Sequence, residues 1–197
     1  NLDEMTSRVK GFFILVFGLA SLQTIAQQEL HFNVSNVIFY EINGDFELGI
    51  KDYLSVSAFG SYVFGLPVKD DYDPYKKYSY LGAELRLYPG SKMNMSGFFL
   101  GIYGKYSFGD LYTTLYTNTA NNTVQRQVWD FNKTSIGITM GSKWMIGNHF
   151  NIGFLLGAGR FVSINYSEPG TVDKAEFFGL DQNLYDFRAG LMVGWRF

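Results

Sequence analysis

The sequence predicts an all-β fold, an eight-stranded antiparallel up-and-down transmembrane β-barrel. Three observations lead to this prediction. Apolar and polar residues alternate with period two along eight segments, as in strands with one apolar and one polar face. Short and long connections alternate between these segments, which is typical of up-and-down membrane barrels. Aromatic residues on the apolar faces gather toward the two ends of the strands, as at the two interfaces of a membrane.

The composition is consistent with one domain of this class. The 197 residues include 22 Gly, 4 Pro and 18% aromatic residues, which suits a β-barrel better than a helical membrane protein. The chain has no Cys, so disulfides, thiol nucleophiles and cysteine-based metal sites are excluded. The 16 basic and 18 acidic residues nearly balance, which gives no reason to expect nucleic-acid binding.

Residues 1–26 have the pattern of a signal peptide, with Met5 interpreted as the true start. Two basic residues precede an apolar run over residues 11–22. A run of this length fits the signal-peptide range of roughly 7–15 residues and is too short for a spanning helix of about 20. Small residues precede the expected cleavage after Ala26, so residues 27–197 are expected to form the barrel.

Eight strands are expected along the chain, at residues 30–38, 42–50, 53–64, 79–88, 97–109, 131–146, 149–165 and 184–197. The first two are the least regular, because residues 30–50 are also compatible with one long bent strand. That alternative would leave seven strands. An even number places both chain ends on the same side of a membrane, so two strands are predicted here.

The closing strand shows the alternation most clearly. Every second residue from Tyr185 to Phe197 is apolar, and the residues between them include Asp186, Arg188 and Arg196. The last strand of a soluble sandwich or lipocalin-like barrel also alternates, but there the apolar face points inward. The membrane interpretation is favoured because the connections and the aromatic residues agree with it.

Connection lengths alternate regularly along the predicted strands. Short turns follow the second, fourth and sixth strands, and one of them, Gly147-Asn148, is a favoured hairpin turn. Long polar connections follow the third, fifth and seventh strands, at residues 65–78, 110–130 and 166–183. A soluble sandwich has no reason to alternate in this way.

Aromatic residues on the apolar faces form two groups. The group at the short-turn end is Phe98, Trp144, Phe150, Trp195 and Phe197. The group at the long-loop end is Tyr62, Phe64, Tyr106, Phe108, Tyr185 and Phe187. Two such girdles around an aliphatic band are typical of a membrane-spanning barrel.

Charged residues of both signs collect on the polar faces. An eight-stranded barrel is just wide enough for side chains to fill it, and buried charges are retained when they are paired. The sequence therefore predicts an interior ion-pair plug formed by Asp45, Glu47, Glu84, Arg86, Lys105, Lys143, Arg188 and Arg196. A selective channel, the alternative, would favour one sign of charge and more strands.

The predicted barrel, over residues 30–197, resembles small outer-membrane barrels of the OmpA-membrane-domain and OmpX type. Within these it is similar to an uncharacterised bacterial family whose members end in Gly-aromatic-Arg-Phe, here Gly194-Trp195-Arg196-Phe197. The resemblance implies a monomer in the outer membrane of a Gram-negative bacterium, with periplasmic termini and lipid and lipopolysaccharide around it. It also implies that the outer-membrane insertion machinery reads the apolar residues of the last strand, Leu191, Val193, Trp195 and Phe197.

No catalytic, cofactor or metal site is predicted. Only His31 and His149 are available as near-neutral bases. Outer-membrane lipid hydrolases on this scaffold have a Ser two residues after the His, and here both histidines are followed by Asn at that place. The acidic residues at Asp70, Asp71 and Asp73 offer carboxylates for Ca²⁺, but their spacing matches no known loop and a solvated loop is expected.

The leading hypothesis is a non-enzymatic outer-membrane barrel with a structural or surface-binding role through its long outer loops. The alternatives are a narrow pore, a lipid-modifying enzyme and a soluble periplasmic barrel that binds a small apolar ligand. The direction of Leu85, Ile102, Ile138 and Val193 separates the last alternative from the others. These side chains face lipid in a membrane barrel and a central cavity in a soluble one.

Overall fold

The computed structural model describes residues 27–64, 75–90, 95–116, 124–166, 176–177, 180–181 and 184–197. The signal peptide predicted over residues 1–26 and the acidic loop at residues 70–73 lie outside these ranges. Within the described ranges, no helix is both long and apolar enough to cross a membrane.

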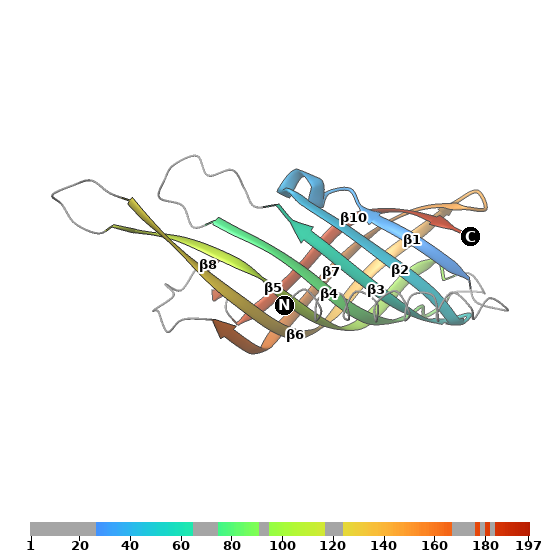
Figure 1. The fold of residues 1–197 in the computed structure, drawn as a ribbon. Coiled ribbons are helices and arrows are strands. Elements are labelled where there is room, and N and C mark those ends of the chain that lie inside the picture. The colour runs from blue at the N-terminus through green and yellow to red at the C-terminus, as the bar shows by residue number, and fades with distance from the viewer. Residues whose placement is uncertain are drawn as a thin grey trace, which may run out of the picture.

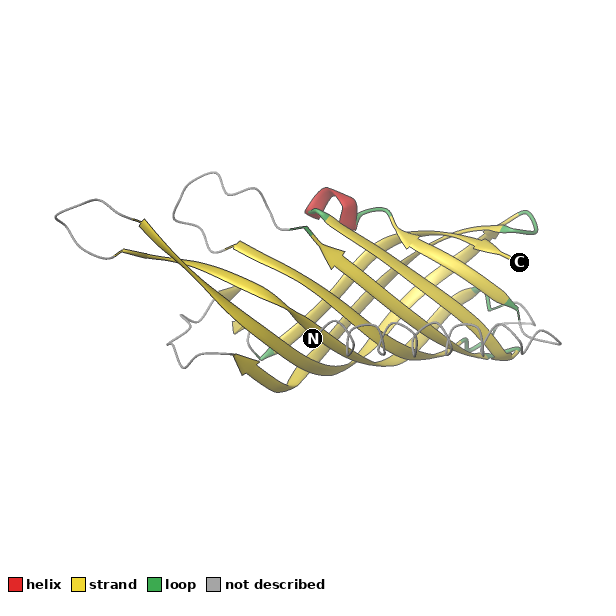
Figure 2. Cartoon of the chain, viewed as in Figure 1, coloured by secondary structure: helices red, strands yellow, loops and turns green. Residues whose placement is uncertain are grey.

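The described chain forms a closed antiparallel barrel of eight strands in the order β1-β10-β7-β6-β5-β4-β3-β2 (Figures 1 and 2). Each barrel strand pairs with its neighbours along the chain, and the last pairs with the first, so the predicted fold class is confirmed. The strands are β1 (Gln28–Asn33), β2 (Glu41–Lys51), β3 (Leu54–Val63), β4 (Tyr75–Leu87), β5 (Gly97–Tyr116), β6 (Val124–Ile146), β7 (Phe150–Tyr166) and β10 (Tyr185–Arg196). A separate short pair, β8 (Glu176–Phe177) with β9 (Leu180–Asp181), lies between β7 and β10 in the sequence. Closure leaves the barrel without an unpaired sheet edge.

Residues 30–50 form two strands rather than one. β1 and β2 pair antiparallel, with Glu29 opposite Glu47. Between them lies a short 3₁₀ helix, η1 (Asn36–Phe39), which ends at Tyr40 in the left-handed conformation with φ of 57°. β1 ends at Asn33, earlier than predicted, because the chain turns into η1 where consecutive apolar residues replace the alternation.

The hairpin of β5 and β6 is much longer than predicted. The two strands stay paired as far as Tyr116 opposite Val124, so most of the loop predicted at residues 110–130 is strand and that prediction was wrong. The β-branched and aromatic residues of the segment, such as Tyr112 and Thr113, favour extended backbone even without one continuous apolar face. In Figure 1 this hairpin extends beyond the other strands, at the end opposite the C-terminus.

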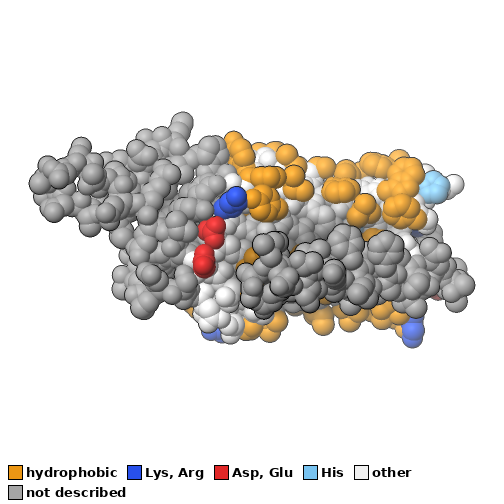
Figure 3. Space-filling view, in the orientation of Figure 1, with side chains coloured by type: hydrophobic (Ala, Val, Ile, Leu, Met, Phe, Trp, Pro, Cys, Tyr) orange, Lys and Arg blue, Asp and Glu red, His pale blue; other side chains and the backbone are white. Residues whose placement is uncertain are grey.

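The apolar faces of the strands point outward. Leu85 is 41% exposed, Ile102 60% and Ile138 62%, and Val193 lies on the outward face between the buried Met192 and Gly194. Orange hydrophobic side chains accordingly cover much of the described wall in Figure 3. In the described barrel these side chains point away from the lumen, which is the opposite of what a soluble barrel with an apolar ligand in its interior requires.

The predicted aromatic residues also lie on the outer wall. All eleven members of the two groups are between 37% and 70% exposed. At the short-turn end the indole ring of Trp195 stacks on His149 with ring centroids 5.2 Å apart. At the other end Tyr62 and Phe64 meet edge to face, with centroids 4.8 Å apart.

The strand register fixes the stagger of the barrel. Following paired residues around the barrel from Leu30 leads to Tyr185 on β10, yet Leu30 itself pairs with Trp195, ten residues further along that strand. For eight strands about 4.8 Å apart with about 3.3 Å per residue, this stagger tilts the strands by about 40°. A barrel of this size has a lumen that side chains can fill.

Candidate functional site: the interior charge network

The lumen holds a network of buried charged side chains, here called the central network. Its members are Glu29, His31, Asp45, Glu47, Glu84, Arg86, Lys143, Arg188 and Arg196. They come from the inward faces of β1, β2, β4, β6 and β10. Strand alternation places them there, because their neighbours along each strand carry the apolar wall.

Arg86 on β4 is the hub of the central network. Its guanidinium lies 2.5 Å from Asp45, 2.8 Å from Glu47 and 3.1 Å from Glu84. The side chain is only 1% exposed, and it also lies 5.0 Å from the ring centroid of Phe99. A guanidinium can bind three carboxylates at once because its N–H donors are arranged in a rigid planar fork.

Lys143 on β6 joins two further carboxylates. Its ammonium lies 2.6 Å from Glu29 and 3.0 Å from Glu47. Arg196 on β10 also donates to Glu29, through Nε at 2.7 Å and through Nη2. Glu29 is completely buried, and these two cations offset the free energy of burying its charge.

His31 on β1 lies between two carboxylates. Nδ1 is 2.8 Å from Asp45 and Nε2 is 2.9 Å from Glu29. Ionised carboxylates accept hydrogen bonds and do not donate them, so both ring nitrogens must act as donors. This pattern is that of the protonated imidazolium, which adds another cation to the network.

Arg188 on β10 connects the network to aromatic side chains. It donates to Glu84 at 2.9 Å, and its guanidinium lies 3.7 Å from the ring centroid of Phe59 and 4.9 Å from that of Tyr103. Thr139 donates a further hydrogen bond to Glu84 at 2.5 Å. Cation–π contacts of this kind are stronger away from water.

Hydroxyl groups satisfy further carboxylate oxygens. Ser55 and Tyr88 both donate to Glu47 at 2.5 Å, and Ser57 donates to Asp45 at 2.6 Å. Buried charges persist when they are both paired and hydrogen-bonded. The central network meets both conditions.

A second charge pair lies nearer the long-loop end. Lys105 on β5 pairs with Asp186 on β10. Asp186 also accepts hydrogen bonds from Tyr103 and Ser135, each at 2.8 Å. The Lys105 ammonium lies 4.8 Å from the ring centroid of Tyr80.

All eight residues predicted for the interior lie on inward faces of the barrel. The structure brings seven of them into the central network and places Lys105 in the separate pair with Asp186. Sequence reasoning missed the parts played by Glu29, His31 and Asp186. The polar face of the closing strand already contained Asp186, whereas Glu29 lay just before the predicted first strand.

The four residues of the predicted insertion signal lie on the outer wall of β10 and at the C-terminus. Trp195 is 49% exposed and Phe197 is 70% exposed. Leu191 and Val193 lie on the same outward face. Their role in insertion stays a prediction.

Three of the network residues have the spacing of a metal site. Glu29, His31 and Glu47 offer ligand atoms that all lie within 4.8 Å of one another. However, the Lys143 ammonium bridges the two carboxylates, and both nitrogens of His31 already contact carboxylates. This donor set therefore does not fit a metal ion.

The network also lacks the geometry of a serine hydrolase. Ser57 and His31 both bind Asp45, on different oxygens. Nucleophilic catalysis needs the hydroxyl to donate to the imidazole, with the carboxylate behind it. Asp45 stands between the two groups here, so Ser57 is not activated by His31.

Comparison with known proteins places the chain in a family. The family model described as "Protein of unknown function (DUF3575)" matches residues 11–185. The chain belongs to the DUF3575 family. The DUF3575 match covers every strand of the barrel before β10 and ends at the first residue of β10, so the network residues Arg188 and Arg196 lie beyond it.

Among solved structures, the crystal structure of the N-terminal β-barrel domain of Pseudomonas aeruginosa OprF is similar to this DUF3575 chain. The identity is 12%, the match covers 87% of this chain and 96% of the OprF chain, and the TM-score is 0.41. No curated protein is significantly similar to the chain. The pairing of the strands by itself defines the closed eight-stranded barrel.

Proposed function

We propose that the protein is a non-enzymatic barrel of the bacterial outer membrane, with periplasmic termini. The central network closes its lumen as an ion-pair plug, and the long-loop end contacts lipopolysaccharide or other surface partners. One observation carries the proposal: the described wall is apolar on the outside and charged on the inside. In water this arrangement would expose a continuous apolar surface, which is unfavourable, whereas in a bilayer the hydrocarbon covers it.

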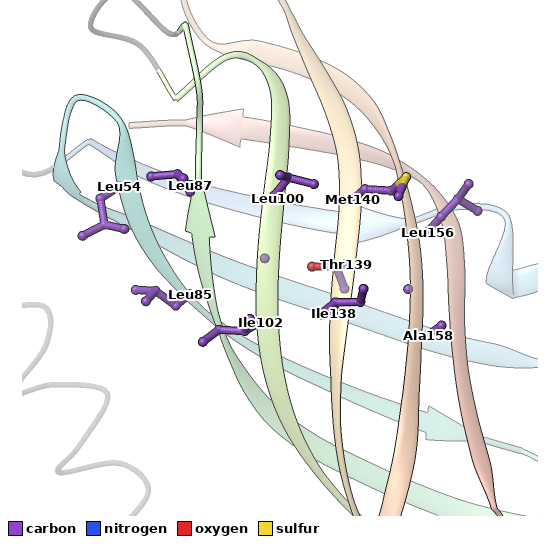
Figure 4. A pocket seen from close by; sticks show the side chains of 12 residues that line it. Leu54, Leu85, Leu87, Leu100, Ile102, Ile138, Thr139, Met140, Leu156 and Ala158 are labelled. Carbon is purple, nitrogen blue, oxygen red and sulfur yellow. The ribbon is translucent and has the colours of Figure 1, made fainter.

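The outer wall supports contact with lipid. One hollow on this wall has a volume of about 700 Å³ and lies over β4, β5, β6 and β7. Figure 4 shows Leu85, Leu100, Ile102, Ile138 and Met140 around it, on neighbouring strands. These are outward-facing aliphatic side chains, so the hollow faces away from the lumen and suits hydrocarbon chains.

The plug is supported by ion pairs that cross the barrel axis. In the closed order of strands, β6 lies opposite β2 and β10 lies opposite β4. Lys143 on β6 reaches Glu47 on β2, and Arg188 on β10 reaches Glu84 on β4. Because each pair joins strands on opposite sides, the two pairs cross the path that ions would take.

Conductance measurements in planar bilayers test the plug. We expect the wild type to show at most rare, small openings, and we expect Glu84→Ala and Arg86→Ala to open more often because each breaks buried ion pairs of the plug. Asp52→Ala is the control, since Asp52 is exposed in the turn between β2 and β3. Large, steady, ion-selective conductance of the wild type would contradict the plug and favour a pore.

Cell fractionation tests the location. The mature protein should be recovered with the outer membrane, and mass spectrometry should place its N-terminus near Gln27 or Gln28. Recovery from the soluble periplasmic fraction would contradict the proposal. The two experiments are independent, because an outer-membrane barrel can conduct or be closed.

A further inference from the structure

A second part of the lumen is a cavity rather than a packed network. It has a volume of about 310 Å³ and lies between the central network and the long-loop end. Asp45, Arg188 and Met192 lie on its network side, and Phe39 and Glu41 lie toward the long-loop end. At roughly 30 Å³ for each water molecule, the space corresponds to about ten waters, which is enough for a small ligand.

Glu41 differs from the other acidic residues that face the lumen. Glu29, Asp45, Glu47, Glu84 and Asp186 each form an ion pair with at least one Lys or Arg. In the part of the chain that the structure describes, Glu41 forms none. It accepts hydrogen bonds from Ser61, at 2.7 Å, and from Tyr80, and both reach the same oxygen, Oε1.

The remaining oxygen, Oε2, therefore lacks a donor among the described residues. Glu41 is half-buried and lines the cavity. A carboxylate in a partly enclosed site is stabilised by a nearby cation more strongly than one in bulk water. The cavity accordingly offers a carboxylate oxygen that accepts no hydrogen bond from the described residues, on a side chain without an ion pair among them.

Aromatic rings surround the same space. Phe39, Tyr78 and Tyr80 line the cavity together with Glu41. Aromatic faces attract ammonium groups, and a carboxylate beside such rings is a recognised way to bind organic cations. Two cations line the cavity among the described residues, Lys105 and Arg188. Lys105 is held by Asp186 and lies over Tyr80, and Arg188 is held by Glu84, so both charges are offset by other carboxylates.

We propose that this cavity binds a small organic cation, with its ammonium group at Glu41 and its alkyl groups against Phe39 and Tyr78. A cation would compensate the charge of Glu41, and a neutral molecule of the same shape would not. The proposal does not depend on the plug or on the cellular location, since it concerns only the space between the central network and the long-loop end.

Three probes of similar size test the proposal by calorimetry or NMR, with the folded protein in a non-ionic detergent. Choline carries a trimethylammonium group, 3,3-dimethyl-1-butanol is its neutral analogue, and glycine betaine adds a carboxylate to the same cation. We expect choline to bind saturably and at least about tenfold more tightly than the neutral analogue. Glycine betaine should bind more weakly than choline, because its carboxylate meets Glu41 and Asp186.

Two variants and a control locate the site. Glu41→Gln keeps the acceptor oxygen for Ser61 and Tyr80 but removes the charge, so choline should bind at least about tenfold more weakly. Tyr78→Leu removes one ring and should weaken binding without changing the charge. Asp52→Asn removes a carboxylate at the other end of the barrel and should have no effect. Circular dichroism checks that each variant is folded.

Several outcomes would overturn the proposal. One is the absence of saturable choline binding to the wild type, and another is equal binding of choline and its neutral analogue. Tighter binding of glycine betaine would show a site for zwitterions, with Lys105 as the second contact. Unchanged choline affinity in folded Glu41→Gln would place any binding elsewhere. Each of these results would leave the proposed outer-membrane role intact.

Discussion

Replacing Arg86 by Met should destabilise the barrel by about 3–5 kcal/mol, the range for breaking a buried ion pair. Met keeps most of the length of the side chain and removes the charge. Three carboxylates lose a partner, but each retains another cation: Asp45 retains His31, Glu47 retains Lys143 and Glu84 retains Arg188. The expected loss is therefore that of one broken pair rather than the sum of three.

The assay is a urea titration of folding into lipid vesicles, in which Trp fluorescence reports the folded fraction. Arg160→Met is the matched control, because Arg160 is exposed on the outward face of β7 and takes part in none of the described ion pairs. Removing a charge from the outer wall should leave stability unchanged or raise it slightly. A loss below about 1 kcal/mol for Arg86→Met, or equal losses for the two variants, would refute the reasoning from burial and pairing.

Two further predictions concern the faces of the barrel. Leu100→Arg and Ile138→Arg, on the outer wall, should each lower the free energy of unfolding by about 2–4 kcal/mol in the same titration, whereas Tyr62→Arg near the rim should lower it less. Equal losses at the three sites would contradict the assignment of faces. Gly82→Ala should destabilise the barrel by about 1–3 kcal/mol, because the added Cβ would lie 2.2 Å from the Phe59 ring and 2.5 Å from the carbonyl oxygen of Gly104. Gly104→Ala is its control, since a Cβ there meets nothing within 4 Å, and similar losses for both glycines would show that crowding in the lumen is not the cause.

The sequence by itself determined which side chains face the lumen. In a strand, neighbouring side chains point to opposite faces, so the apolar set of Leu85, Ile102 and Ile138 assigns the opposite face to Glu84 and Arg86. This inference needs only the alternation of apolar and polar residues along each strand and the assignment of the apolar face to lipid. The closing pair of β1 and β10 and the split of residues 30–50 followed from the even strand number.

The alternation of apolar and polar residues did not predict two local features, the length of one hairpin and the start of the first strand. The long β5–β6 hairpin was missed because residues such as Tyr112 and Thr113 lack a single apolar face, and pairing with the opposite strand is what holds them extended. Glu29 was missed because the first strand begins before the alternation becomes clear.

Only the tertiary structure decided which charges meet. Lys143 and Glu47 are 96 residues apart, and Arg188 and Glu84 are 104 apart. Their contacts depend on the number of strands, on the ten-residue stagger and on which strands lie opposite each other. Among the described residues, the same geometry leaves Glu41 beside the cavity without an ion pair. Alternation fixes the direction of a side chain, whereas its height and its partner across the lumen depend on how the whole sheet closes.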